Sequence, residues 1–237
     1  MIFEQEYTYR PFGQYVQSRS QTMQNQPNSQ SSPSAGEQAI LEAAEILFAR
    51  KGFDGVSMSS IAGLANTSKP NIYHHFKNKN DLYLAVIKTA VRRTSVLLDA
   101  LEDAPGTFRQ RLTEFSSGQL DNILKHKRST QLILRETLSE GSQHGPEIAR
   151  LVMGEVYDRL VAMVHQGQQE NEFRKDVDPA LAAFLIVSAN MFFFQASPVM
   201  QHLPKLDFTD DTNSYSRGVM DLLINGILQK GNKNATS

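Results

Sequence analysis

The residues best placed for chemistry lie in one short stretch that begins at Ser68 and ends at Lys79, and they suit the recognition of a polyanion. Lys69, Lys77 and Lys79 carry positive charge there, and the stretch contains no acidic residue. The amide of Asn71 can offer a donor and an acceptor together, which is the pattern that reads a base edge. A short basic run alone is more often a solvated face than a DNA contact, so the surrounding pattern has to decide between the two interpretations.

Two serines mark the starts of two short helices in this region. Ser57 can cap a first helix whose inner face carries Ile61 and Ala65, and Ser68 can cap a second helix that has Pro70 in its first turn. Only a few residues separate the two helices. The pattern therefore predicts a helix-turn-helix, in which the first helix supports the second and the opening turn of the second enters the major groove.

The same region resembles the DNA-binding domain of the TetR family of transcriptional regulators. The resemblance covers Ser34 to Val86, about a quarter of the chain. The family signature is matched in order and spacing by Gly52-Phe53, Ser57, Ile61-Ala62, Ala65, Ser68, Tyr73, His75-Phe76 and Lys79. Asn66 stands where the family usually has glycine, and asparagine is the next-best residue for a left-handed backbone. Gly63 weakens the first helix by about 1 kcal/mol relative to alanine.

The exposed residues of the two helices are expected to make two kinds of contact with DNA, to bases and to phosphates. We expect base contacts from the first turn of the second helix, which holds Lys69, Pro70 and Asn71. The resemblance implies phosphate contacts from a second set of side chains, which comprises Ser57, Ser68, Tyr73, His74, Lys77 and Lys79. The partner is then double-stranded DNA, and a local basic patch explains how a chain of formal net charge −1 binds it.

Two other interpretations of these side chains are weaker. His74 and His75 cannot share a metal ion, because adjacent helical residues point about 100° apart, and His75 is expected to pack against the domain core. Tyr73 and Phe76 could form a stacking platform for single-stranded nucleic acid, yet aromatic residues at helical spacing usually belong to a core.

The elements around this region predict an all-α fold with a small N-terminal domain and a larger bundle. Residues 1–33 are expected to be a disordered tail, because Gln14–Ser34 is dominated by Gln, Ser, Asn and Pro. Met23 lies in that tail and is an alternative translation start. We expect a three-helix DNA-binding domain over 34–80, a helical effector-binding and dimerisation domain over 81–230, and a flexible tail over 231–237.

Apolar residues recur at helical spacing to the C-terminus, and no segment alternates as a strand does, so essentially no strand is predicted. A capping box at Ser34–Glu37 should begin the first helix, which should end near Lys51 with Gly52 as its left-handed cap. Further helices are expected around Leu82–Leu101, Thr107–Leu124, Ser129–Ser139, Gly145–Val164, Asp178–Phe194 and Tyr215–Ile227.

The segment from Ala180 to Phe194 is apolar on every side except at Ser188 and Asn190, so its helix should be buried almost completely. A membrane span is disfavoured, because the run is shorter than the roughly 20 residues that a bilayer needs. Burial between two copies of the chain is the better interpretation, and the last helix also carries one apolar stripe. The predicted homodimer interface comprises Phe184, Val187, Met191, Tyr215, Val219, Leu222, Leu223 and Ile227.

The resemblance also implies an apolar pocket for a small apolar or amphipathic effector, with Met153, Tyr157, Met191, Phe192 and Phe194 as its lining. Plain core packing explains these residues equally well. An effector bound there would favour a spacing of the two recognition helices that no longer fits a palindromic operator, which describes a repressor. A helical small-molecule receptor or adaptor that has lost DNA binding is the alternative, and Gly63 and Asn66 would be the first signs of such a loss.

The composition and the absence of certain motifs exclude or disfavour several other functional classes of protein. Cysteine is absent, which excludes disulfides, thiolate zinc sites and cysteine nucleophiles. No HExxH, phosphate-binding glycine loop or G-x-S-x-G occurs, so neither an enzyme built on the bundle nor a cofactor nor a metal site is expected. Residues 1–34 lack the basic start and apolar stretch of a secretory signal, which predicts a cytoplasmic protein without membrane contact.

Overall fold

The computed structural model describes residues 33–138, 144–150, 154, 156–203, 206, 208 and 211–227. Apart from residue 33, the two predicted tails lie outside this range. The described residues are mainly helical, and no strand occurs among them, as predicted. The helices are α2 (Ala35–Lys51), α3 (Met58–Leu64), α4 (Lys69–His75), α5 (Lys79–Glu102), α6 (Phe108–Lys125), α7 (Lys127–Leu138), α8 (Gly145–Ile148), α9 (Val156–Gln169), α10 (Pro179–Met200) and α11 (Thr212–Ile227).

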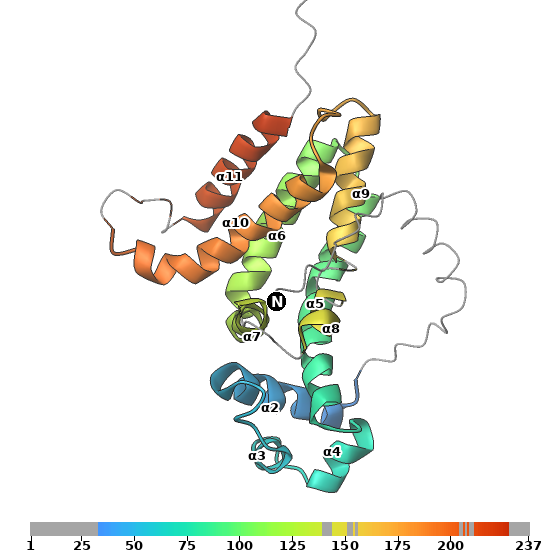
Figure 1. The fold of residues 1–237 in the computed structure, drawn as a ribbon, viewed down its shortest axis with the longest axis vertical. Coiled ribbons are helices and arrows are strands. Elements are labelled where there is room, and N and C mark those ends of the chain that lie inside the picture. The colour runs from blue at the N-terminus through green and yellow to red at the C-terminus, as the bar shows by residue number, and fades with distance from the viewer. Residues whose placement is uncertain are drawn as a thin grey trace, which may run out of the picture. The chain divides into compact units, whose positions relative to one another are not determined.

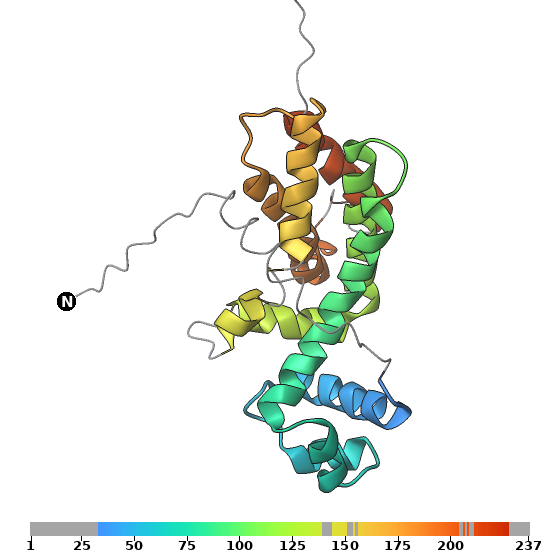
Figure 2. The ribbon, with the colours of Figure 1, turned by 90° about the vertical axis from the view of Figure 1, so that its right-hand side faces the viewer.

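Helices α2, α3 and α4 gather around the first turns of α5, and the rest of α5 runs into the bundle (Figures 1 and 2). Ile40 on α2, Ile61 on α3 and Ile72 on α4 have no exposed surface and belong to one apolar core with residues of α5. The ring of Tyr83 on α5 meets the ring of Phe48 edge to face, with 4.9 Å between centroids. Burial of these apolar side chains is the main contribution that holds the short helices in place.

Helix starts follow the sequence closely because side-chain caps are local. Ser57 and Ser68 cap α3 and α4, and each accepts a hydrogen bond from the backbone N–H three residues later. Thr107 begins α6 with a full capping box that includes Gln110. Asp178 caps α10 in front of Pro179. The caps predicted at Ser57 and Ser68 are therefore confirmed, whereas the capping box at Ser34–Glu37 stays a prediction.

The described residues from Gly36 onward form one compact unit, so a division of the chain at residue 80 stays a prediction. Within this unit α6 packs against α5, α9, α10 and α11. Within the segment predicted as one helix from Gly145 to Val164, α8 covers Gly145–Ile148, residues 149–150 are π-helical and α9 begins at Val156. Residues 151–153 and 155 lie outside the described range, so the continuity of this helix stays a prediction. Gly154 lies between α8 and α9, and its backbone N–H donates to the carbonyl of Arg150 at 3.2 Å.

Helix α10 is longer than the sequence suggested and less buried. Its 22 residues make it the one described helix that is long and apolar enough to cross a membrane, yet only 28% of its most apolar window is buried. One face contacts the bundle, and there Asn190 donates hydrogen bonds to Ser116 and Gln119. In a single copy of the chain Leu181, Phe184 and Phe192 are at least half exposed, so the predicted burial of α10 between two copies stays a prediction.

Candidate nucleic-acid interface and ligand cavity

The turn between α3 and α4 has the left-handed backbone that the sequence predicted. Asn66 has a φ of 48°, a region that favours glycine and asparagine, and the backbone N–H of Thr67 bonds to the carbonyl of Ala62 at 3.0 Å. Gly52, at the end of α2, has a φ of 72° and is the predicted left-handed cap. Gly63 faces open space, where an added Cβ would meet no atom within 4 Å, so its cost is only one of helix propensity.

Helix α4 presents its first turn to solvent. Ile72 is fully buried and fixes the helix to the core, whereas Ser68, Lys69 and Pro70 are exposed. Farther along the chain, Tyr73 is 49% exposed, and His74 and Lys77 also face solvent. On α3, Ser57 is exposed at the N-terminus. His75 is half-buried, as expected for a residue that packs beside the core.

Asn71 has less hydrogen-bonding capacity than the sequence suggested. Its amide nitrogen donates to the hydroxyl of Thr67 at 2.9 Å, and the side chain is half-buried. This bond uses one of the two amide hydrogens, so the carbonyl oxygen and the second N–H remain to read a base edge. The contact also fixes the rotamer of Asn71 before any ligand arrives.

Lys79 occupies a different position from the other lysines. Its ammonium donates to the backbone carbonyls of Phe53 and Val56 at 3.0 and 3.1 Å and lies 4.1 Å from the centroid of the Phe53 ring. Lys79 thus connects the first turn of α5 to the loop between α2 and α3. Among the described residues its third N–H has no acceptor, and this hydrogen is the only one left for the phosphate contact that was expected.

The loop between α4 and α5 is held by its own residues. The carboxylate of Asp81 accepts a hydrogen bond from the backbone N–H of Lys77 at 3.1 Å, and Asn78 caps α5 by accepting from the backbone N–H of Asp81. The carboxylate nearest to the basic patch is therefore engaged inside the loop. The lysines at positions 69 and 77 keep their exposed ammonium groups.

A cavity of about 350 Å³ opens among α5, α6, α7, α9 and α10, and its wall is mainly apolar. Tyr157, Met191 and Phe192 line it, as three of the predicted pocket residues. Phe194 is not among its lining residues, and Met153 lies outside the described residues. Three residues that were predicted for the dimer interface, Phe184, Val187 and Met191, line this cavity.

The cavity has a polar corner that sequence reasoning missed. Arg93 on α5 donates to the hydroxyl of Ser129 at 3.0 Å, and that hydroxyl in turn donates to the carboxylate of Glu45 on α2. His126 lines the same corner, where burial and then the Arg93 charge lower its pKa below the usual value. Arg93 follows Val86 and Ala90 at i+7 and i+3, so a charge on the inner face of a helix was the signal that could have revealed it.

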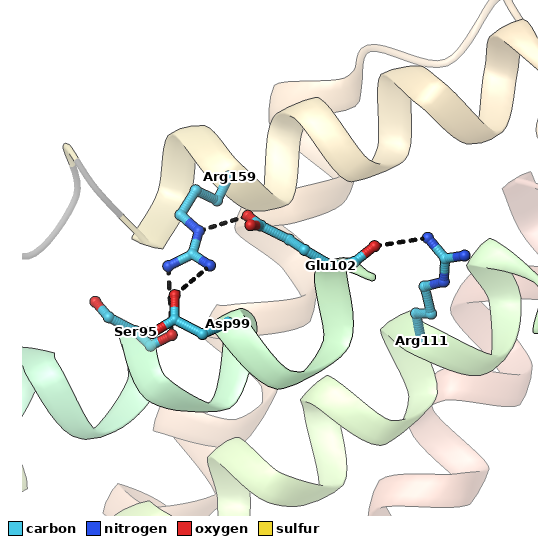
Figure 3. A network of polar contacts seen from close by, with 5 residues as sticks. All are labelled: Ser95, Asp99, Glu102, Arg111 and Arg159. Atoms are coloured by element: carbon cyan, nitrogen blue, oxygen red, sulfur yellow. Dashed lines mark hydrogen bonds and ion pairs between the residues drawn. The ribbon is translucent and has the colours of Figure 1, made fainter. Parts of the chain in front are cut away.

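The far half of α5 is fixed by a second polar network (Figure 3). Arg159 on α9 donates to Glu102 at 2.6 Å, to Asp99 at 2.8 Å and to the backbone carbonyl of Ser95 at 3.3 Å. Burial opposes the charge of Arg159, but the hydrogen bonds to these carboxylates outweigh it and raise its pKa. Arg111 on α6 donates to the carbonyl of Glu102 at 3.0 Å and joins a third helix to the network.

The residues predicted for a dimer interface differ in exposure. Leu222 is 78% exposed and Phe184 is 50% exposed, whereas Val187, Met191, Val219 and Leu223 are half-buried. The side chain of Ile227 lies outside the described residues. Tyr215 packs within its own chain, where its hydroxyl donates to the carbonyl of Ala189 at 2.6 Å and its ring lies 4.1 Å from that of Phe193. No group of three or more potential metal ligands occurs in the described part of the chain.

Two family models match the chain. The model described as bacterial regulatory proteins, tetR family, matches residues 40–86, and the model of a tetracyclin repressor-like C-terminal domain matches residues 109–221. The chain is 25% identical to the HTH-type transcriptional regulator RutR of Escherichia coli K12, over 82% of this chain and 91% of RutR. It is 24% identical to the HTH-type transcriptional repressor NicS of Pseudomonas putida, over 72% of this chain and 81% of NicS.

A solved structure shows the same fold. The transcriptional regulator FadR from Bacillus subtilis, determined in complex with stearoyl-CoA, superposes with a TM-score of 0.66 at 19% identity, over 80% of this chain and 98% of that one. At this level of identity the likeness concerns the fold alone.

Proposed function

Because the chain belongs to the TetR family of DNA-binding transcriptional regulators, we propose that it is an effector-responsive repressor that binds a palindromic operator as a homodimer. The observation that carries this proposal is the exposed first turn of α4, which is held by the buried Ile72 and by the Ser68 cap. Lys69, Pro70 and Asn71 would face base edges from this turn. Ser57, Ser68, Tyr73, His74 and Lys77 would contact phosphates, together with the remaining N–H of Lys79.

The homodimer is supported by the exposed side of α10 and α11. Leu181, Phe184 and Leu185 form exposed apolar surface on α10, and Leu222 does so on α11. Exposed apolar surface of this extent on adjacent helices is typical of a protein–protein interface. A second copy would cover it, which would complete the burial that the composition of α10 predicts.

The cavity supports the effector part of the proposal. Its volume lies near the lower end of the roughly 300–1,000 Å³ that ligand pockets occupy, and its wall is mostly apolar with a few polar groups. FadR was determined in complex with stearoyl-CoA, which supports an effector that carries an apolar chain. On the same premise we infer that the protein has no catalytic activity, needs no cofactor and acts in the cytoplasm.

The DNA part is tested by selecting bound duplexes from a random library and measuring their affinity by gel shift over a salt series. We expect a palindromic consensus. Lys77→Ala should lower the slope of log affinity against log salt by about one, while the exposed Lys175→Ala, far along the chain, should leave it unchanged. If no sequence is enriched, the alternative of a receptor or adaptor without DNA binding is favoured.

The homodimer is tested by sedimentation equilibrium at micromolar concentration. Leu222→Glu should dissociate the dimer, because it places a charge in the apolar interface. Asn213→Glu, at an exposed position on the opposite side of the same helix, is the matched control and should stay dimeric. A monomeric wild-type protein would contradict the proposal.

A further inference from the structure

We propose that the cavity binds a small amphipathic molecule with one anionic headgroup, and that Arg93 both holds the headgroup and reports its presence to α2. This inference rests on the proposed effector function of the cavity. It adds the chemical class of the ligand and the residues that connect the ligand to the DNA-binding helices.

The charge of the cavity wall selects an anion. Arg93 carries a guanidinium with five N–H donors, and among the described residues Ser129 is its only side-chain acceptor. None of the described residues that line the cavity is an aspartate or a glutamate. His126 beside it has a lowered pKa and stays uncharged near neutral pH. A guanidinium with unused donors in a mainly apolar wall fits a carboxylate, which it can hold through two parallel hydrogen bonds.

The apolar residues that line the cavity determine which apolar group of the ligand fits. Val91, Ile123, Ile133 and Leu134 line the cavity from α5, α6 and α7, and Met191 and Phe192 line it from α10. A volume of about 350 Å³ is small for a ligand pocket, so it suits an apolar chain of moderate length better than a nucleotide conjugate. A straight-chain carboxylate therefore satisfies both the charge and the apolar surface.

Arg93 also begins a chain of contacts that leaves the cavity. Its Nη1 donates to the Ser129 hydroxyl at 3.0 Å, and the single hydroxyl hydrogen of Ser129 goes to Glu45. Ser129 is only 4% exposed, so water does not readily replace either partner. The chain joins α5, α7 and α2, and α2 packs in the same core as α3 and α4.

An anionic headgroup that accepts hydrogen bonds from Arg93 would compete with the Arg93–Ser129 hydrogen bond. When the guanidinium turns to a carboxylate, the Ser129 hydroxyl loses its donor, and the charge that faces Glu45 is partly neutralised. The C-terminal half of α5 is held by Arg159, so the adjustment falls on the N-terminal half, which carries the core of α2, α3 and α4. Occupation of the cavity and the position of α2 thereby become coupled.

The ligand class is tested by calorimetric titration of the full chain with straight-chain carboxylates from hexanoate to dodecanoate. 1-Octanol and octyltrimethylammonium are the neutral and cationic controls. We expect at least one carboxylate to bind more than tenfold more tightly than either control. Arg93→Met, which keeps the length of the apolar stem, should weaken that carboxylate between roughly tenfold and a hundredfold. Arg92→Met removes the same charge from an exposed neighbouring position and should bind as the wild type does.

The ligand assignment is overturned if no carboxylate of the series binds, or if Arg93→Met binds it with unchanged affinity. Circular dichroism melting curves of each variant verify that a lost signal is not lost folding. Arg93→Lys is the second variant, and it should recover part of the affinity because it restores the charge without the bidentate geometry.

The link to α2 is tested with Ser129→Ala and a DNA duplex recovered by selection. Wild-type protein should lose DNA affinity when the carboxylate is added, by roughly five- to 150-fold. Ser129→Ala should bind the carboxylate within about threefold of wild type and lose most of this response. An unchanged response in Ser129→Ala overturns the link. A wild-type protein that selects no DNA contradicts the proposed function, whereas the calorimetric result still decides the ligand class.

Discussion

Replacement of Lys79 by methionine should destabilise the protein through contacts inside the chain. Methionine keeps the apolar stem but removes the ammonium, which donates to the carbonyls of Phe53 and Val56 at 3.0 and 3.1 Å. Both carbonyls lie in the loop between α2 and α3, so the loop would lose its connection to α5. The expected primary effect is therefore on stability, with DNA affinity affected through it.

The magnitude follows from the three contacts of the ammonium. A hydrogen bond to a charged group contributes about 1.5–3 kcal/mol, and the lower end applies to Lys79 because it is half-buried. The cation–π contact with Phe53 adds about 0.5–1 kcal/mol. Because contributions of neighbouring contacts are not additive, we expect a total loss of about 2–4 kcal/mol in the free energy of unfolding. For a chain of this size each kcal/mol lowers Tm by about 2–4 °C.

Urea unfolding followed by far-ultraviolet circular dichroism measures this loss directly. Lys77→Met is the matched control, because Lys77 is exposed and near in sequence, and it should change the free energy by less than about 0.5 kcal/mol. A loss below about 0.5 kcal/mol in Lys79→Met would refute the conclusion that the Lys79 ammonium stabilises the loop between α2 and α3. The phosphate contact would then be its main role.

Three further predictions concern other parts of the chain. Asn66→Val should cost about 1–2 kcal/mol in urea unfolding because φ is 48°, whereas Asn66→Gly should be nearly neutral; equal costs would contradict a strained turn. Arg159→Met should cost about 1–2 kcal/mol at low salt and less at 1 M NaCl, and a loss independent of salt would exclude an ionic origin. The pKa of His126 is lowered by burial and then by Arg93, so its uncharged form stabilises the fold above the usual pKa of 6.5, and this contribution is lost as pH falls through the lowered value. His126→Gln should therefore flatten the decline of stability between about pH 7 and pH 5, and parallel curves would contradict the shift.

Features that depend on neighbouring residues could be predicted from the sequence. Caps at Ser57, Ser68 and Asp178 involve backbone groups two or three residues away, so residue type and spacing suffice. The left-handed turn at Asn66 was predictable for the same reason, because few residues tolerate positive φ. The order of the helices followed from apolar spacing along the described part of the chain.

Features that depend on distant residues could not be predicted. The Ser129 hydroxyl bonds to Glu45 across 84 positions of the chain, and Arg93 bonds to Ser129 across 36. A single sequence gives no sign of which polar residues meet when helices pack. Lys79 illustrates the same limit, because the resemblance implied a phosphate contact while its nearest acceptors lie 23 and 26 positions earlier.

Helix α5 contributes to three parts of the molecule: the core of the DNA-binding helices, the cavity wall and the polar network around Arg159. Its first turns belong to the core of α2, α3 and α4, Arg93 in its middle lines the cavity, and its last turns are held by Arg159. A coupling between two sites typically requires only about 1–3 kcal/mol. Exchange of one charge-assisted hydrogen bond contributes about 1.5–3 kcal/mol, so the Arg93–Ser129 contact alone is large enough to account for such a coupling. Because Arg159 holds the C-terminal end of α5, a changed contact at Arg93 would displace the N-terminal end, against which α2, α3 and α4 pack. Arg93 lies between these two ends, in a position to couple the cavity to the DNA-binding helices.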